Sequence, residues 1–180
     1  LAALTTAAGL AHDDHGAQAT TRRQLRFLCA SLGLDPEPVT RILAQPEVIH
    51  FCGHMTAPPS ARARFPHEQQ AGVAAQVREK LQRHRVGFAH GSLASGADII
   101  IAEIALALGI ELHVVLPFAI DEFIAISVAP AGPDWVERFR HCLGAANSVT
   151  IASDSAYQGD DVLCAYAGRI AMGQALNRAA

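Results

Sequence analysis

Four short apolar runs, separated by longer segments with helical periodicity, constrain the fold of this chain more than any other feature. The runs cover residues 48–52, 86–89, 112–116 and 148–152. The helical patterns cover residues 67–84, 95–108, 133–143 and 160–176. Strands that alternate with helices form βαβ units, and continuous apolar strands are typical of a parallel sheet covered on both faces. The pattern predicts an α/β protein, a Rossmann-like three-layer α/β/α fold with a mainly parallel sheet.

The first 45 residues differ from the rest because they contain helical patterns without an apolar strand. A helix is predicted from the Thr20/Thr21 cap to Gly33, and a shorter one is predicted from Asp35 to Leu43. We therefore divide the chain into a helical lead-in or linker, 1–45, and a Rossmann-like domain, 46–180. Because the chain begins with Leu rather than Met, we expect it to be part of a longer protein.

Composition narrows the class of protein. A chain of 180 residues that is 51% hydrophobic and 17% charged can bury a sizeable core, which excludes a disordered tail. The net charge of −3 does not favour nucleic acid or acidic membranes as partners. The apolar stretch 99–118 carries Glu103, Glu111 and His113, so we expect no membrane span. The four scattered cysteines predict buried, reduced thiols and a cytoplasmic location.

The turn between the second strand and the following helix is the most informative segment. It reads Gly91-Ser92, then Ser95-Gly96-Ala97-Asp98 at the start of the helix. A helix N-terminus with small residues is suited to phosphate, since its N–H groups and dipole favour an anion. The same residues could instead make only a tight strand-to-helix connection. Neither the P-loop nor the dinucleotide glycine motif is present.

Two further loops should leave the sheet at the same edge, because right-handed crossovers place all carboxyl ends of parallel strands together. The first contains Gly53, His54 and Arg64, which could contact a ribose or a phosphate. The second begins with Pro117-Phe118 and continues through 121–135, a segment long enough to cover the edge. The aromatic residues of this region could stack on a base or seal the core, and we favour the core for Trp135.

Other reactive residues give weaker patterns. His50, His54 and His90 lack a third ligand at metal spacing, so we predict no metal site. We interpret His113 as a hydrogen-bonded core residue. Glu103 could be a catalytic acid, but we favour a partner arginine or the solvent edge of its helix. No cofactor is expected.

The glycine turn also carries a family resemblance. The series Gly91-Ser92, Ser95-Gly96-Ala97-Asp98, Ala102, Ala105, Gly109 resembles the G-[GS]-x-x-x-G-A-D-x-x-A-x-x-A-x-x-x-G signature of the SLOG superfamily. This superfamily groups Rossmann-like domains related to lonely-guy phosphoribohydrolases and DNA-processing protein A. The resemblance covers about residues 47–178 and includes Gly53-His54, Leu116-Pro117-Phe118, and Tyr166, Arg169 and Met172 in order.

The resemblance implies a domain that binds nucleotides or their derivatives, of the type found in bacterial multidomain proteins beside helical repeats or nucleotide cyclase domains. A homodimer is left open. The lonely-guy enzymes carry a second loop, P-G-G-x-G-T-x-x-E, whose Glu serves hydrolysis. Here the third strand is followed by Pro117-Phe118-Ala119-Ile120 without glycines, and Asp121 or Glu122 has no assigned role. The sequence therefore favours binding over hydrolysis.

We expect a nucleotide-binding sensor or regulatory domain of a larger bacterial protein, with the phosphate at the Gly91–Asp98 turn. The alternatives are a nucleoside-monophosphate N-glycosidase and a protein-interaction module with a decayed pocket. Gly96→Asp or Asp98→Arg is expected to abolish binding without unfolding the domain. The predicted ligand-binding residues are Gly53, His54, Arg64, Gly91, Ser92, Ser95, Gly96, Ala97, Asp98, Pro117 and Phe118.

Overall fold

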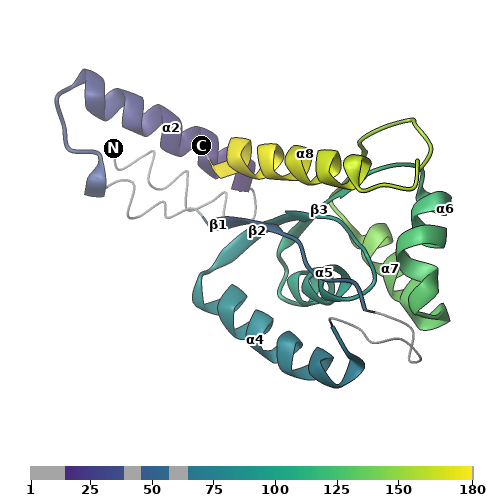
Figure 1. The fold of residues 1–180 in the computed structure, drawn as a ribbon. Helices are drawn as coiled ribbons and strands as arrows, with labels where there is room; N and C mark the ends of the chain where they lie inside the picture. The colour runs from purple at the N-terminus through teal and green to yellow at the C-terminus, as the bar shows by residue number, and fades with distance from the viewer. Residues whose placement is uncertain (1–14, 39–45, 57–64, 180) are drawn as a thin grey trace. The chain divides into compact units, whose positions relative to one another are not determined.

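A computed structural model describes residues 15–38, 46–56 and 65–179 of the chain (Figure 1). The chain divides into two compact units, Leu1–Pro46 and Glu47–Ala180. Among the described residues, no helix combines the length and the apolar character that a membrane crossing requires.

The first unit contains helix α2, His15–Ser31, which ends as the sequence predicts but begins before the predicted Thr20/Thr21 cap. Gly33 has a φ of +65°, a left-handed conformation that suits glycine after a helix. The Leu34 N–H donates to the Cys29 carbonyl across this turn, at 2.8 Å. The second predicted helix begins after Asp35, whose Oδ1 accepts the Glu37 N–H at 2.9 Å. Its remainder, 39–45, lies outside the described residues.

The second unit is built on a four-stranded parallel sheet with the strands in chain order, β1-β2-β3-β4. The strands are β1 Glu47–Phe51, β2 Val86–Gly91, β3 Glu111–Leu116 and β4 Ser148–Ile151. All four lie on the predicted apolar runs, within two residues at either end. The α/β class and the parallel sheet are confirmed.

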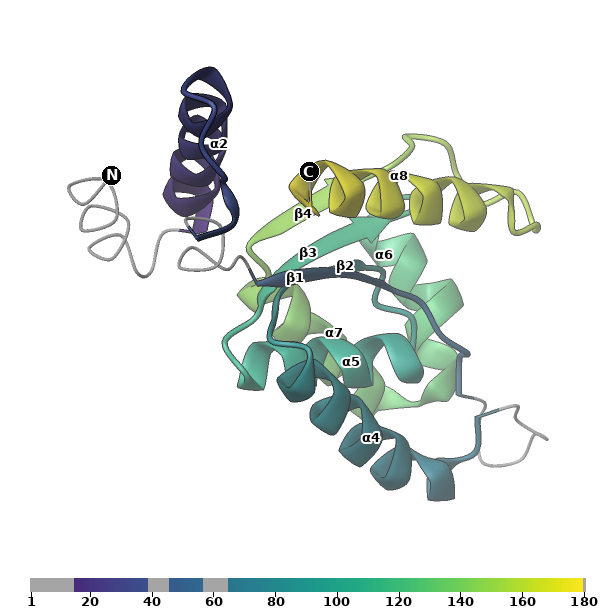
Figure 2. The ribbon, with the colours of Figure 1, turned by 90° about the vertical axis from the view of Figure 1, so that its left-hand side faces the viewer.

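Helices cover both faces of this sheet and make a Rossmann-like three-layer fold (Figure 2). They are η1 His67–Gln69, α4 Gln70–Arg83, α5 Ala97–Ala107, α6 Ile120–Phe123, η2 Ile124–Val128, η3 Ala129–Ala131, α7 Pro133–Ala145 and α8 Val162–Ala179. Because the strands follow one another in chain order, right-handed crossovers place α4, α5 and α7 on one face. Helix α8 follows the last strand on the opposite face, where it contacts β1, β2 and β3.

The two faces of the sheet differ in chemistry. The face under α4, α5 and α7 carries most of the hydrophobic core, including Phe51, Leu112, Val114 and Leu116. The α8 face has only a small apolar cluster, centred on Val115 and the alanines of α8. Most of the burial that stabilises the domain therefore lies on one side of the sheet.

Helix α8 buries a different stripe from the one its sequence suggests. The sequence pattern places Leu163, Tyr166 and Ile170 on one face of the helix predicted over 160–176, which would be the buried face, yet Tyr166 is 48% exposed. The buried residues of α8 are Ala167, Ala171 and Ala175. Small side chains let the helix lie close to the sheet, so the prediction for Tyr166 was wrong.

Glu103 forms an ion pair with an arginine, as we expect from the sequence in preference to a catalytic role. Both of its carboxylate oxygens accept from Arg138 of α7, at 2.7 Å to Nε and 2.7 Å to the terminal nitrogen. The Arg138 guanidinium also lies 3.9 Å from the centre of the Trp135 ring. Trp135 itself is buried, as expected for a residue that seals the core.

Arg138→Ala should lower the free energy of unfolding by about 1 kcal/mol, because the bidentate pair is only partly shielded from water. Urea denaturation measures this loss. Glu103→Gln and the double variant complete a thermodynamic cycle, in which the two substitutions should not be additive. Full additivity would contradict a stabilising pair between α5 and α7.

Candidate functional site

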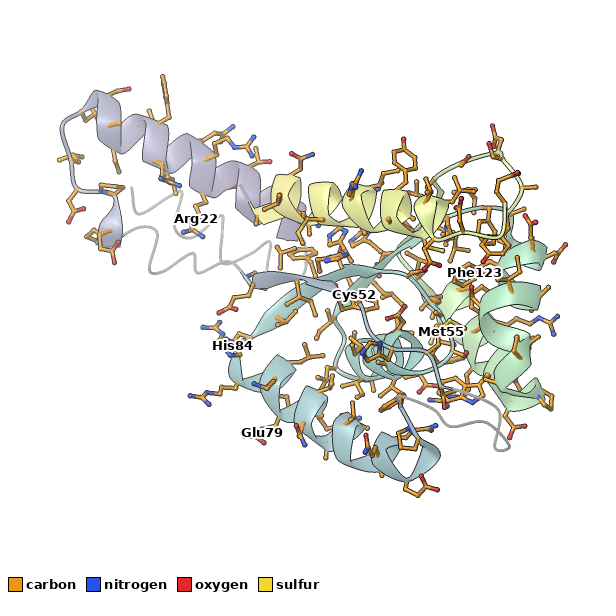
Figure 3. The ribbon with its side chains drawn as sticks, in the orientation of Figure 1. Arg22, Cys52, Met55, Glu79, His84 and Phe123 are labelled. Atoms are coloured by element: carbon orange, nitrogen blue, oxygen red, sulfur yellow. The ribbon has the colours of Figure 1, made fainter. Side chains whose placement is uncertain are left out.

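A pocket of about 250 Å³ opens at the carboxyl edge of the sheet, between the strand ends, α6 and the first half of α8. Figure 3 labels three of its lining residues: Cys52 and Met55, which follow β1, and Phe123 of α6. The lining residues come from six segments and are His50, Phe51, Cys52, Gly53, Met55, Ser92, Ala94, Asp98, Val115, Pro117, Phe123, Ser127, Asp161, Cys164, Ala167, Gly168 and Ala171.

In the turn before α5, several backbone N–H and carbonyl groups form hydrogen bonds with the backbone of other loops of the protein. The Ser95 N–H donates to the Ser127 carbonyl at 2.9 Å, and the Ala97 N–H donates to the His54 carbonyl at 3.2 Å. The Thr56 N–H in turn donates to the Ser95 carbonyl at 2.9 Å. The first loop and the segment after α6 are thus held against the turn, and these N–H groups already have acceptors.

Gly96 allows this close approach between backbones. It forms an antiparallel bridge with Met55, and its φ of +123° is unfavourable for any residue with a side chain. A Cβ on Gly96 would lie 2.5 Å from the His54 carbonyl oxygen and 2.6 Å from the Thr56 nitrogen. The glycine is therefore needed for contact with the first loop of the protein itself.

Ser95 and Asp98 have the spacing of a capping box in the sequence, but they do not form one. Gly96, not Ser95, is the N-cap residue of α5, and no side chain caps this helix. Ser95 is fully buried, and its Oγ has no hydrogen-bond partner among the described residues. The helix begins at Ala97 because the backbone of Gly96 is held away from helical angles by its bridge to Met55.

Asp98 is the most perturbed group at the carboxyl edge. It is 6% exposed, and burial raises the pKa of its carboxyl from 3.8 to about 7, against the effect of hydrogen bonds from the Ala94 and Gly53 N–H groups. Its Oδ1 has no partner among the described residues, and neither does the buried Oγ of Ser92. Because both residues line the pocket, these two acceptors are available to a bound molecule.

The structure brings four of the eleven predicted binding residues to this pocket: Gly53, Ser92, Asp98 and Pro117. Phe118 is fully buried and packs against Phe123 and Tyr157. The remaining predicted residues do not line the pocket: Gly91, Ser95, Gly96 and Ala97 shape the turn, His54 is exposed in the first loop, and Arg64 lies outside the described residues.

The wall that α8 contributes was not predicted. Cys164 of α8 and Asp161, just before this helix, line the pocket together with Cys52, which follows β1. Cys52 and Cys164 are exposed, so the expectation of buried thiols is wrong for both, whereas Cys29 and Cys142 are buried. No local pattern marks these residues, because α8 lies more than 60 positions from the glycine turn in the sequence.

The segment after β3 covers the edge as expected, through Phe123 and Ser127. The two acids considered for catalysis do not line the pocket. Asp121 is exposed, and Glu122 accepts the Tyr157 N–H at 3.1 Å. Within the part of the chain that the structure describes, no group of three or more His, Cys, Asp or Glu side chains is arranged to hold a metal ion.

Comparison with models of known protein families gives no match, and a search of curated proteins finds none with significant sequence similarity. The fold and the site together define an α/β protein with a mostly apolar pocket at the carboxyl edge of a parallel sheet, in which Ser92 and Asp98 supply buried polar atoms.

Proposed function

We propose that the Glu47–Ala180 unit binds a nucleotide or a nucleotide-derived small molecule in the carboxyl-edge pocket and acts as a sensor or regulatory domain. One observation carries this proposal: two buried acceptors without partners, Ser92 Oγ and Asp98 Oδ1, lie in the wall of the pocket. Ligands of open α/β sheets bind at this edge. The resemblance of the glycine turn to the SLOG signature supports the same ligand class.

The lining suggests which part of the ligand is held where. Asp98 and Ser92 can accept hydrogen bonds from ribose hydroxyls or from the amino group of a base. Pro117 and Phe123 offer apolar surface to the ring. The described lining contains two acids, Asp98 and Asp161, and neither lysine nor arginine. A phosphate group should therefore lie away from Asp98, toward the opening of the pocket, and not at the Gly91–Asp98 turn where the sequence places it.

A panel of mononucleotides, dinucleotides, cyclic nucleotides, ADP-ribose and NAD tests this proposal by thermal shift. A ligand at about 100 times its Kd should stabilise the protein by about 2.7 kcal/mol. Asp98→Asn should weaken binding of that ligand by about tenfold or more, since it removes a charged acceptor, and Ser92→Ala should weaken it several-fold. Asp134→Asn, an exposed change on α7, is the matched control.

A panel without any thermal shift at millimolar ligand, or equal affinities in all variants, would contradict the proposal and favour a protein-interaction module.

Three further expectations rest on the same resemblance and on the composition: that the domain is part of a larger bacterial protein, that this protein is cytoplasmic, and that it forms a homodimer. They stand with the nucleotide proposal as expectations for the full-length protein.

An N-glycosidase is a second candidate, and the state of Asp98 favours it. A carboxyl group with a pKa of about 7 inside a pocket is suited to proton transfer near neutral pH. This activity requires release of free base from a nucleoside monophosphate by the wild-type chain and its loss in Asp98→Asn. Binding without base release would leave the sensor as the function of the pocket.

A further inference from the structure

A row of polar side chains crosses the α8 face of the sheet. His50, His90, His113 and Ser148 occupy paired register positions on the four neighbouring strands. Neighbouring strands lie about 4.8 Å apart, so these side chains stand next to one another. Sheet faces covered by a helix are usually apolar, and the opposite face of this sheet follows that rule.

His90 is the least satisfied member of the row. It is 4% exposed. Among the described residues, no atom lies at hydrogen-bonding distance and angle from either of its ring nitrogens. Its ring stacks on that of His113, with centroids 4.5 Å apart and planes at 15°. His113 Nδ1 lies 2.8 Å from Ser148 Oγ, and its buried Nε2 has no hydrogen bond among the described residues but lies 3.6 Å from Glu111 Oε2. Buried nitrogens of this kind need a hydrogen-bond partner, which an ordered water, an ion or a ligand can supply.

These nitrogens line a second pocket, of about 360 Å³, beside the last two turns of α8. Its lining consists entirely of polar residues and is rich in hydrogen-bond donors. The lining residues are His90, His113, Ser148, Gln174, Asn177 and Arg178. None of the six lines the carboxyl-edge pocket, so the two sites are separate.

Arg178 supplies the positive charge of this second pocket. Its guanidinium lies 4.1 Å from the centre of the Phe88 ring, which orients it. Its terminal nitrogen is 3.4 Å from Glu111 Oε2, a long contact between side chains that are 36% and 28% exposed. Such a solvent-screened pair is weak, and an oxyanion that accepts two hydrogen bonds can replace the carboxylate.

We propose that this donor-rich pocket binds a phosphate group, either free or as part of a phosphorylated small molecule. Phosphate has enough acceptor oxygens to engage Arg178, the amides of Gln174 and Asn177, and the imidazole N–H groups together. This function goes beyond the nucleotide proposal, because it concerns another site and other residues.

Binding at this site should take up a proton. The pKa of His90 is lowered from 6.5 to about 4, mainly by burial and also by the positive charges of His113, Arg178 and His50, whereas the Gln174 side chain, as a hydrogen-bonding group, opposes the shift. Glu111, the acid on this face, favours protonation of the adjacent His113. A bound dianion reverses the sign of the local potential and favours protonated His90, so affinity should increase as pH falls.

The test uses the full chain and sulfate, a dianion whose charge stays constant between pH 5 and 8. Calorimetry should show saturable binding that strengthens by up to about tenfold per pH unit below neutral, the limit for uptake of one proton. Long-range ¹H–¹⁵N NMR spectra should show shifts of the His90 and His113 ring nitrogens. Inorganic phosphate and AMP are then compared through the shifts of these two ring nitrogens, which report on this pocket and not on the carboxyl-edge pocket. Equal affinities indicate a site for the free oxyanion, and tighter AMP binding indicates a phosphorylated metabolite.

Variants separate this site from the other pocket. Arg178→Ala should weaken sulfate binding by about tenfold or more. Arg169→Ala, an exposed change on the same helix outside the lining, should leave it unchanged. Asp98→Asn should also leave it unchanged, whatever its effect on nucleotide binding. Absence of saturable binding, or equal losses in Arg178→Ala and Arg169→Ala, would overturn the proposal.

Discussion

Gly96→Ala should lower the free energy of unfolding by about 4 kcal/mol, the largest effect expected of a single methyl group in this protein. About half comes from the φ of +123°, which an alanine adopts only with strain. The rest comes from the shift of the first loop, because the new Cβ would lie 2.5 Å from the His54 carbonyl oxygen. Thermal denaturation should show a fall of about 15 °C in Tm for a unit of this size.

Gly109→Ala is the matched control for this substitution. Gly109 also has a positive φ, +71°, but a Cβ there would meet no atom within 4 Å. Its loss should be about 1–2 kcal/mol, the cost of the left-handed conformation alone. Equal losses at the two positions would show that the contact between the first loop and the α5 turn contributes nothing to stability.

Asp98 should give the domain an unusual dependence of stability on pH. Its pKa is about 7 in the folded protein against 3.8 when unfolded, so between these values the folded state binds one proton more than the unfolded state. The free energy of unfolding therefore falls as pH rises from 4 to 7, by up to about 4 kcal/mol. Below pH 4 this contribution is fully present, and above the folded pKa it is lost.

Asp98→Asn should remove this contribution and make the protein more stable than the wild type at pH 8. The difference in unfolding free energy between wild type and variant, measured in urea from pH 4 to 8, isolates the effect. His90, with its pKa of about 4, destabilises both proteins equally in acid and cancels from this difference. Asp134→Asn should run parallel to wild type. A constant difference between wild type and Asp98→Asn would show that the pKa of Asp98 is the same in the folded and unfolded states.

The effects expected at Gly96 and Asp98 decide which variants can test ligand binding at the carboxyl-edge site. Gly96→Asp was expected to abolish binding without unfolding the domain, but the close backbone contacts of Gly96 make it a stability variant first. Asp98→Arg would force a longer, charged side chain into a position that is 6% exposed. Asp98→Asn and Ser92→Ala preserve the size of the side chain or reduce it, so they report on binding.

The order and type of the elements follow from the sequence because strands and helices leave local periodic patterns. The runs at 48–52 and 112–116 have the length and boundaries of buried strands, and the segment after Pro133 has those of an amphipathic helix. The edge that holds the site follows as well, since every parallel strand ends there. Gly53, Ser92, Asp98 and Pro117 could be placed at the pocket on that reasoning alone.

The partners of each residue were decided only in three dimensions. A glycine-rich turn has the same sequence pattern whether its N–H groups face a phosphate or the carbonyls of another loop, and here Ser95 and Ala97 donate to Ser127 and His54. The row of histidines was hidden because register joins residues about 25 to 40 positions apart. Helix α8 closes both pockets through contacts far along the chain, which no local pattern records. Sequence determines local conformation, whereas hydrogen-bond partners and pocket walls depend on distances that exist only once the chain is folded.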